Sequence, residues 1–410
     1  MILEKDKSII RELAKRYMEF AGSEKQKKMF KRFRDSNDLK IVRPPVILDE
    51  IPWYQLNMDD ELTCICEGEK ERGVELQLRK ALFYVKHFKA DNFYEPFIRI
   101  ARTVENSGIG VSVRDSNQRR TDDFNNIVSH EYEDVLADEE SLNLIHDPVY
   151  TLRPDKDAEN VEYFTDLLGD TMPVKLFGYA DFYFPPWDYI SSLRGVEPIM
   201  LDMYSRPEHI HAIMKKFTSI ANARIDFYEK NLTADPTMPS VHCTPASISG
   251  MAEDGMKATW FRGMAQTLGM VSPKMFKEFE IDYIKPIAER FAYTYYGCCE
   301  ALHDRIDILK SISNLRKIGC SPWANVEQCA EQIGKDYVLA RKPNPSHVAI
   351  KTDPAVIRRE IEETVKICIK YGCPCEFTLK DISTVSNRPE NLIVWAKTVS
   401  SVLDEYYGPA

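Results

Sequence analysis

Hydrophobic positions along the chain follow two alternating patterns, a helical period in longer segments and short apolar runs between them. From about residue 76 the two kinds of segment succeed one another, which is typical of β–α units built around a parallel sheet. The pattern is clearest in the last third, where four strands are each followed by a helix. These strands are predicted over 292–300, 316–324, 335–345 and 374–383. The pattern therefore predicts an α/β protein.

The organisation before residue 76 differs from that of the rest of the chain. Residues 1–75 predict a helical lead-in and then an extended crossing around the double proline at 44–45, where helix is disfavoured. The alternation of helix-like and strand-like segments over residues 76–410 predicts one barrel domain. The phosphate-binding loops GxGxxG and GxxxxGK[ST] are both absent from the sequence. Their absence favours a (β/α)8 TIM barrel with an N-terminal helical extension over an open dinucleotide-binding sheet.

Proline marks the start of two long predicted helices. Pro207 lies in the first turn of one, over 206–232, where its missing N–H costs nothing. In the other, over 272–291, Pro273 follows Ser272, a favoured N-cap residue.

Composition and charge narrow the functional classes. The chain has 410 residues, 44% of them hydrophobic, and no uninterrupted apolar run of the ~18 residues that a membrane span requires. Its net charge of -10 disfavours a nucleic-acid partner. The first 20 residues predict an amphipathic helix and not a secretory signal. We therefore expect the ten cysteines to be free thiols in a reducing cytoplasm.

The string YYGCCE at 295–300 ends a predicted strand, where functional side chains gather in a barrel. Alternation along the strand would place Tyr296, Cys298 and Glu300 on one side, with Cys299 opposed. A thiolate and a carboxylate in this arrangement suit Zn²⁺. The alternative is that the cysteines pack as small hydrophobic residues.

Other strand ends carry charged and aromatic residues. Arg341 and Lys342 would hold a carboxylate or phosphate of a substrate, with surface ion pairs as the alternative. Asp381 would be a metal ligand, a general base or an ion-pair partner of its neighbour Lys380. Three further candidates would line the pocket or belong to the structural framework: His242, Trp323 and Tyr179.

Several longer strings occur in an order that resembles a known superfamily. They are RGVEPIMLDMYSRPEHIHAIMKKFT, VSPKMFKEFEIDYIKPIAERF, the strand that ends in the cysteine string, and RPENL. Over roughly residues 170–400 this succession resembles the uroporphyrinogen decarboxylase superfamily. The resemblance implies a (β/α)8 barrel.

The superfamily has two broad kinds of member. True decarboxylases of haem synthesis need no metal and carry a substrate-binding motif of the form RPVWxMRQAGRYLPEY. Residues 42–56 here are VRPPVILDEIPWYQL and contain neither RQAGR nor GRYLPEY, so the arginines that would hold the acidic tetrapyrrole are missing. The cobalamin-dependent methyltransferases bind zinc through a His-x-Cys motif and a later cysteine. In that comparison Cys298 matches the motif cysteine, Tyr296 takes the histidine place and Asp381 falls near the final ligand.

The resemblance thus implies a methyltransferase that moves a methyl group between a small methylated molecule and a corrinoid. Zinc would be held by Cys298, Glu300 and Asp381, and Tyr296 would orient or protonate the leaving group. The chain lacks a DxHxxG corrinoid signature, so methylcobalamin would arrive on a partner corrinoid protein. A homodimer is the assembly that the resemblance suggests.

Two alternatives stay open. A metal-independent decarboxylase would use Arg341, Lys342 and Asp381, and a non-catalytic barrel would only bind a ligand.

Overall fold

The computed structural model describes residues 2–116, 119–120, 128–235, 240–241 and 243–409. Its centre is a seven-stranded sheet whose neighbouring strands all run parallel. The strands, in spatial order, are β1 (Val46–Leu48), β15 (Cys375–Leu379), β14 (Val338–Arg341), β13 (Leu315–Cys320), β12 (Tyr293–Tyr296), β11 (Trp260–Gly263) and β8 (Asp181–Phe184).

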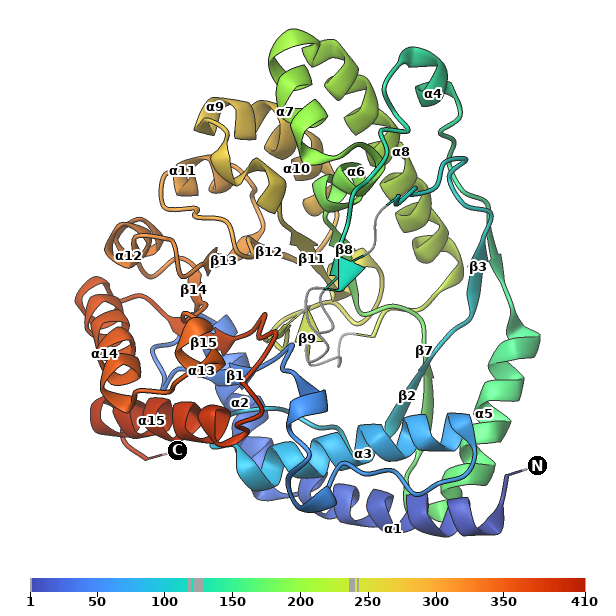
Figure 1. The fold of residues 1–410 in the computed structure, drawn as a ribbon, viewed down its shortest axis with the longest axis vertical. Helices are drawn as coiled ribbons and strands as arrows, with labels where there is room; N and C mark the ends of the chain where they lie inside the picture. Colours follow the sequence, from blue (N-terminus) through green and yellow to red (C-terminus); the bar gives the residue numbers. More distant parts are fainter. Residues whose placement is uncertain (1, 117–118, 121–127, 236–239, 242, 410) are drawn as a thin grey trace.

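The sheet curls, and helices cover its outer side (Figure 1). The main helices are α1 (Glu4–Ala21), α2 (Glu24–Asn37), α3 (Glu69–His87), α5 (Pro154–Leu168), α6 (Pro186–Arg194), α7 (Val196–Ser205), α8 (Pro207–Asn231), α10 (Asp282–Ala288), α12 (Val326–Ile333), α14 (Pro354–Tyr371) and α15 (Glu390–Tyr407). Four strands in the second half of the chain alternate with helices, as the hydrophobic pattern predicts. The α/β class is therefore confirmed.

Alternation along each strand divides its side chains between the sheet's inner and outer faces. On β15, Phe377 and Leu379 belong to the apolar core that the helices cover. Glu376, which precedes Phe377, points to the inner face and forms a buried ion pair of 2.7 Å with Lys317 on β13. The outer face of β15 is thus apolar, whereas its inner face carries buried charge.

The edge strand β1 is capped by side chains. The N–H of Val46 donates to Asp91 Oδ2 at 2.9 Å, and the N–H of Leu48 donates to the Tyr84 hydroxyl at 3.0 Å. These bonds satisfy the backbone donors on the side of β1 away from β15. The next strand along the chain, β2 (Ile98–Ala101), pairs instead with β7 (Val174–Phe177). No ladder joins β1 to β2 or β8 within the described ranges, so a closed eight-stranded barrel stays a prediction.

Individual helix signals agree with the structure. Pro207 begins α8, and the Ser272 hydroxyl accepts a hydrogen bond from the Met275 N–H. The helix predicted over 272–291 is interrupted by a π-helical turn, Lys277–Ile281, which precedes Pro286. Proline lacks an N–H and crowds the preceding turn, which accounts for an irregularity there. None of the described helices is both long and apolar enough to span a membrane.

The N-terminal segment, residues 1–75, contributes a strand to the main sheet and packs against later helices. Helix α3 runs without interruption through residue 75, and β1 supplies an edge of the main sheet. A second apolar cluster packs α1 against α3 and the end of α5, through residues that include Ile10, Leu78 and Leu167.

Candidate functional site

A glycine turn after β12 places two cysteines at the carboxyl end of the sheet. Gly297 has φ +105°, and a Cβ there would lie 2.4 Å from a Leu302 methyl carbon. Only glycine adopts this backbone without strain. The turn ends the strand alternation, so Cys298 is buried and Cys299 half-buried.

Asp381 reaches the same place from the end of β15. The Cys299 sulfur lies 3.1 Å from Asp381 Oδ2 and 3.8 Å from the Cys298 sulfur. One potential ligand atom from each of the three residues lies within 4.8 Å of the others. Carboxyl ends of parallel strands share one edge of a sheet, which is why residues so distant in sequence meet there.

Lys380 supplies a positive charge to this cluster. Its ammonium lies 3.6 Å from the Cys298 sulfur and 2.9 Å from Glu50 Oε2. Burial opposes the charge on Lys380, but its acidic neighbours, which include Asp381, Glu50 and Cys298, outweigh burial and raise the Lys380 pKa. The lysine therefore remains protonated and favours the thiolate of Cys298.

Crowding of acidic groups keeps Cys299 protonated. Its hydrogen bond to Cys298 raises the Cys299 pKa most, followed by burial and by the charges of Cys298 and Asp381. A bound cation would reverse this repulsion, because coordination deprotonates a thiol. Two thiols and one carboxylate are also donors that Zn²⁺ accepts, with one position left open. The donor set thus fits zinc.

Glu300 has a different environment from the one its spacing suggests. Its Oε2 accepts the Cys298 N–H at 2.8 Å, and its Oε1 accepts the Ala265 N–H at 3.2 Å. The carboxylate is buried and fixes the backbone of the cysteine turn. The cluster contains Cys299 in the place where the sequence suggested Glu300, because the turn at Gly297 breaks the alternation.

Tyr296 lies on the outer side of β12. Its hydroxyl is 3.1 Å from Glu280 Oε1, in the layer between the sheet and the helices. The preceding residue, Tyr295, lies on the inner side, where it packs with Trp260 and Ala340. The alternation of side chains holds only within the strand and stops at Gly297. If the pattern is applied to the residues before this glycine alone, Tyr295 and Tyr296 lie on opposite faces, and Tyr295 is the tyrosine that faces inward.

Arg341 and Lys342 also lie on opposite sides of their strand. Arg341 donates to Glu360 of α14 at 3.0 Å and to the Ser321 carbonyl at 2.5 Å, so its charge is used in the helix layer. Lys342 lies on the inner side, with its ammonium 3.0 Å from the Tyr295 hydroxyl. Of this predicted pair, Lys342 is the member that faces the interior.

Arg262 is an inner cation that sequence reasoning missed. Its guanidinium stacks on the Tyr295 ring, 3.9 Å from the centroid, and is fully buried. Its Nε and one terminal nitrogen have no hydrogen-bond partner in the described part of the chain. Burial raises the pKa of Tyr295 to about 12, although the charges of Lys342 and Arg262 oppose this. A buried, unsatisfied guanidinium is costly unless an anion binds it.

Asp188, in the first turn of α6, is a titratable group near the cluster. Partial burial raises its pKa to about 6, and the charges of Cys298 and Glu300 add to the effect. Sequence reasoning did not single it out, since an acidic residue early in a helix is ordinary.

Trp323 and Tyr179, two of the remaining predicted pocket residues, are not members of the cluster. Trp323, on the loop after β13, is 72% exposed. Tyr179 precedes β8, and therefore lies at the amino end of that strand, buried against Tyr228 with ring centroids 5.4 Å apart. His242 falls outside the described residues.

Comparison with known proteins shows no family for this chain. No family model matches the chain, and no curated protein matches it. A solved structure of a methyltransferase from Methanosarcina mazei is similar, with 12% sequence identity and a TM-score of 0.49, covering 92% of this chain and 99% of that one. A likeness at this level does not identify a reaction.

Proposed function

We propose that the protein is a metal-assisted methyltransferase that moves a methyl group between a small methylated molecule and a corrinoid carried on a partner protein. The observation that supports it most is the convergence of Cys298, Cys299 and Asp381 within 4.8 Å at the carboxyl end of the sheet. When bound, zinc would lower the pKa of a thiol or polarise a methoxy or methylthio group.

The side chains around the cluster have distinct parts in this proposal. The Lys380 ammonium, 3.6 Å from the Cys298 sulfur, would favour the thiolate of that cysteine, and Glu300 fixes the backbone of the same cysteine. Lys342 and Arg262, both buried on the inner side, would hold an anionic part of the substrate. Asp188, whose pKa is about 6, would take the proton-donor role that the sequence suggested for Tyr296.

The test combines metal analysis with a spectroscopic assay. We expect the purified full chain to contain about one zinc per chain and to bind less in the Cys298→Ala and Asp381→Ala variants. Mixed with the enzyme, methylcobalamin bound to a corrinoid protein should lose its methyl group to a thiol acceptor and become cob(I)alamin. In the reverse direction, the cob(I)alamin form should gain a methyl group from a panel of methoxylated, methylthio and methylamino compounds. Absence of metal, together with full activity of Cys298→Ala, would exclude the proposal.

A metal-independent decarboxylase remains the second candidate, favoured by the buried cation Arg262 and its unsatisfied nitrogens. Arg262 and Lys342 would bind a substrate carboxylate there. Release of CO₂ that is insensitive to chelators would support this alternative, whereas chelator-sensitive methyl transfer would support the first.

A further inference from the structure

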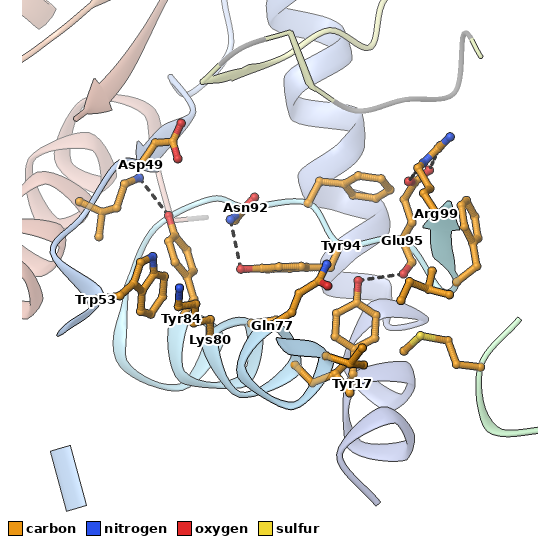
Figure 2. A pocket seen from close by; sticks show the side chains of 18 of the residues that line it. Tyr17, Asp49, Trp53, Gln77, Lys80, Tyr84, Asn92, Tyr94, Glu95 and Arg99 are labelled. Atoms are coloured by element: carbon orange, nitrogen blue, oxygen red, sulfur yellow. Dashed lines mark hydrogen bonds and ion pairs between the residues drawn. The ribbon is translucent and has the colours of Figure 1, made fainter. Parts of the chain in front are cut away.

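A cavity of about 350 Å³ lies beside β1, where that strand is capped by side chains instead of by β2. Its walls come from α1, α3, the segment 92–99 and the loop after β1. Figure 2 shows the rings of Tyr17, Tyr84 and Tyr94 around this space, with Trp53 at its side. A dry cavity of about 150 Å³ is large enough to hold benzene, so this one accommodates a single substituted ring.

The aromatic wall favours a flat apolar ligand. Tyr94 meets Tyr17 and Tyr84 edge to face, with centroids 5.9 and 6.4 Å apart. Phe93 and Phe97 also line the cavity. Aromatic side chains prefer offset or edge-to-face partners, and such contacts add to the free energy of burying the ring.

Most of the charge in the lining is already neutralised. Glu95 makes a two-fold ion pair with Arg99, at 2.5 and 2.6 Å, and Glu50 pairs with Lys380 at 2.9 Å. Asp49 lies at the border, and Figure 2 shows its carboxylate directed away from the rings. A ligand in the cavity would therefore not be repelled or attracted chiefly by these acidic groups.

Lys80 is the exception among the lining charges. Its ammonium lies 5.3 Å from the centre of the Trp53 ring, and it has no hydrogen bond or carboxylate partner within the described ranges. Burial lowers its pKa, which reflects the cost of an ion held against apolar surface. An ammonium in this position gains most from an anionic ligand.

The phenols add donors to this charge. The Tyr84 hydroxyl accepts from the Leu48 N–H and the Tyr94 hydroxyl accepts from Asn92 at 3.1 Å, so both oxygens are used as acceptors. Neither phenol proton has an acceptor in the part of the chain that the structure describes. Lys80 and the two phenols are thus hydrogen-bond donors without acceptors. An ionised carboxylate only accepts hydrogen bonds, so it is the group that matches these donors.

We propose that this cavity binds a small aromatic carboxylate, with the ring among the tyrosines and the acid group at Lys80. The proposal concerns binding alone and holds whether or not the Cys298 cluster carries a metal. Glu50 lines the cavity and pairs with Lys380, whose ammonium contacts the Cys298 sulfur. A ligand in the cavity would therefore lie next to Glu50, two contacts away from Cys298.

The test compares benzoate with its neutral isostere benzamide on the full chain, using ligand-observed NMR to obtain dissociation constants. Because a hydrogen bond to a charged group is stronger than a neutral one, we expect benzoate to bind about tenfold more tightly. Lys80→Met should remove that difference and leave benzamide binding unchanged. Lys86→Met, on the same helix but paired with Glu61, is the matched control and should keep the difference.

A second variant tests the position of the site. Gln77 is exposed and lines the cavity from α3, so Gln77→Trp should fill it without disturbing the core and block both ligands. Equal affinity for benzoate and benzamide in the wild type, no binding of either, or unchanged benzoate binding in Lys80→Met would each overturn the proposal.

Discussion

The thiol of Cys299 lies 3.1 Å from the carboxylate of Asp381, although 82 residues separate them along the chain. Both follow strands of the same parallel sheet, one through a glycine turn and the other through a left-handed residue with φ 58° at Asp381. A non-glycine residue in this conformation is uncommon and is retained where the surrounding structure requires it. The two backbone irregularities bring the ligand atoms together.

The first prediction separates the two candidate ligand sets. Cys299→Ala and Asp381→Ala should lower zinc affinity by more than about 100-fold, because each removes a ligand. Glu300→Gln should lower it only about tenfold, since that carboxylate acts through the backbone of Cys298. Competition with a chromophoric chelator measures all three, and Cys64→Ala, at a free cysteine that is not a member of the cluster, is the control. A larger loss in Glu300→Gln than in Cys299→Ala would restore Glu300 as the ligand.

The second prediction concerns the glycine turn. Gly297→Ala should lower the free energy of unfolding by about 1–3 kcal/mol, because φ +105° is strained for alanine and its Cβ would meet Leu302. Gly372→Ala is the matched control, with φ +62° and nothing within 4 Å of the added carbon. It should cost no more than about 1–2 kcal/mol. Urea unfolding measures both, and equal losses would show that the close approach at Gly297 is relieved at no cost.

The third prediction concerns the buried ion pair between Lys317 and Glu376, 2.7 Å apart. Lys317→Met should destabilise the protein by about 3–5 kcal/mol, because it leaves Glu376 buried without its partner. Adding Glu376→Gln should recover much of this loss, since the second change removes the isolated charge. The exposed pair of Lys370 and Glu327 is the comparison, and Lys370→Met should leave the unfolding curve unchanged.

The fourth prediction is a pH dependence from Glu280, which is fully buried in the π-helical turn. Burial raises its pKa well above the usual value, although hydrogen bonds from Tyr296 and Trp187 oppose the shift. The folded state therefore holds the proton to higher pH than the unfolded state does. Stability from this group is complete below the unfolded pKa of about 4.3 and declines as pH rises towards the folded pKa.

Glu280→Gln should abolish that contribution. The difference in unfolding free energy between wild type and variant is expected to change by up to about 1.4 kcal/mol per pH unit above pH 5, in favour of the variant. Denaturant unfolding between pH 5 and 8 measures it. Parallel curves for the two proteins would show that Glu280 has the same pKa folded and unfolded.

The hydrophobic pattern of the sequence determined which segments form helices and strands. The final four strands and their helices, the start at Pro207 and the cap at Ser272 follow from local periodicity and from the chemistry of single residues. Such signals depend on neighbours within a few positions, so the sequence contains them directly. They also predicted that reactive residues would lie at the carboxyl ends of the strands.

Only the tertiary structure decided which of those residues share a site. Tyr296 and Arg341 lie on the outer side of strands whose inner residues are Tyr295 and Lys342, a difference of one position that strand register fixes. Likewise, Cys299 meets Asp381 because a glycine turn redirects the chain at Gly297. Packing between distant segments sets the register and the direction of each turn, and a local pattern does not contain that information.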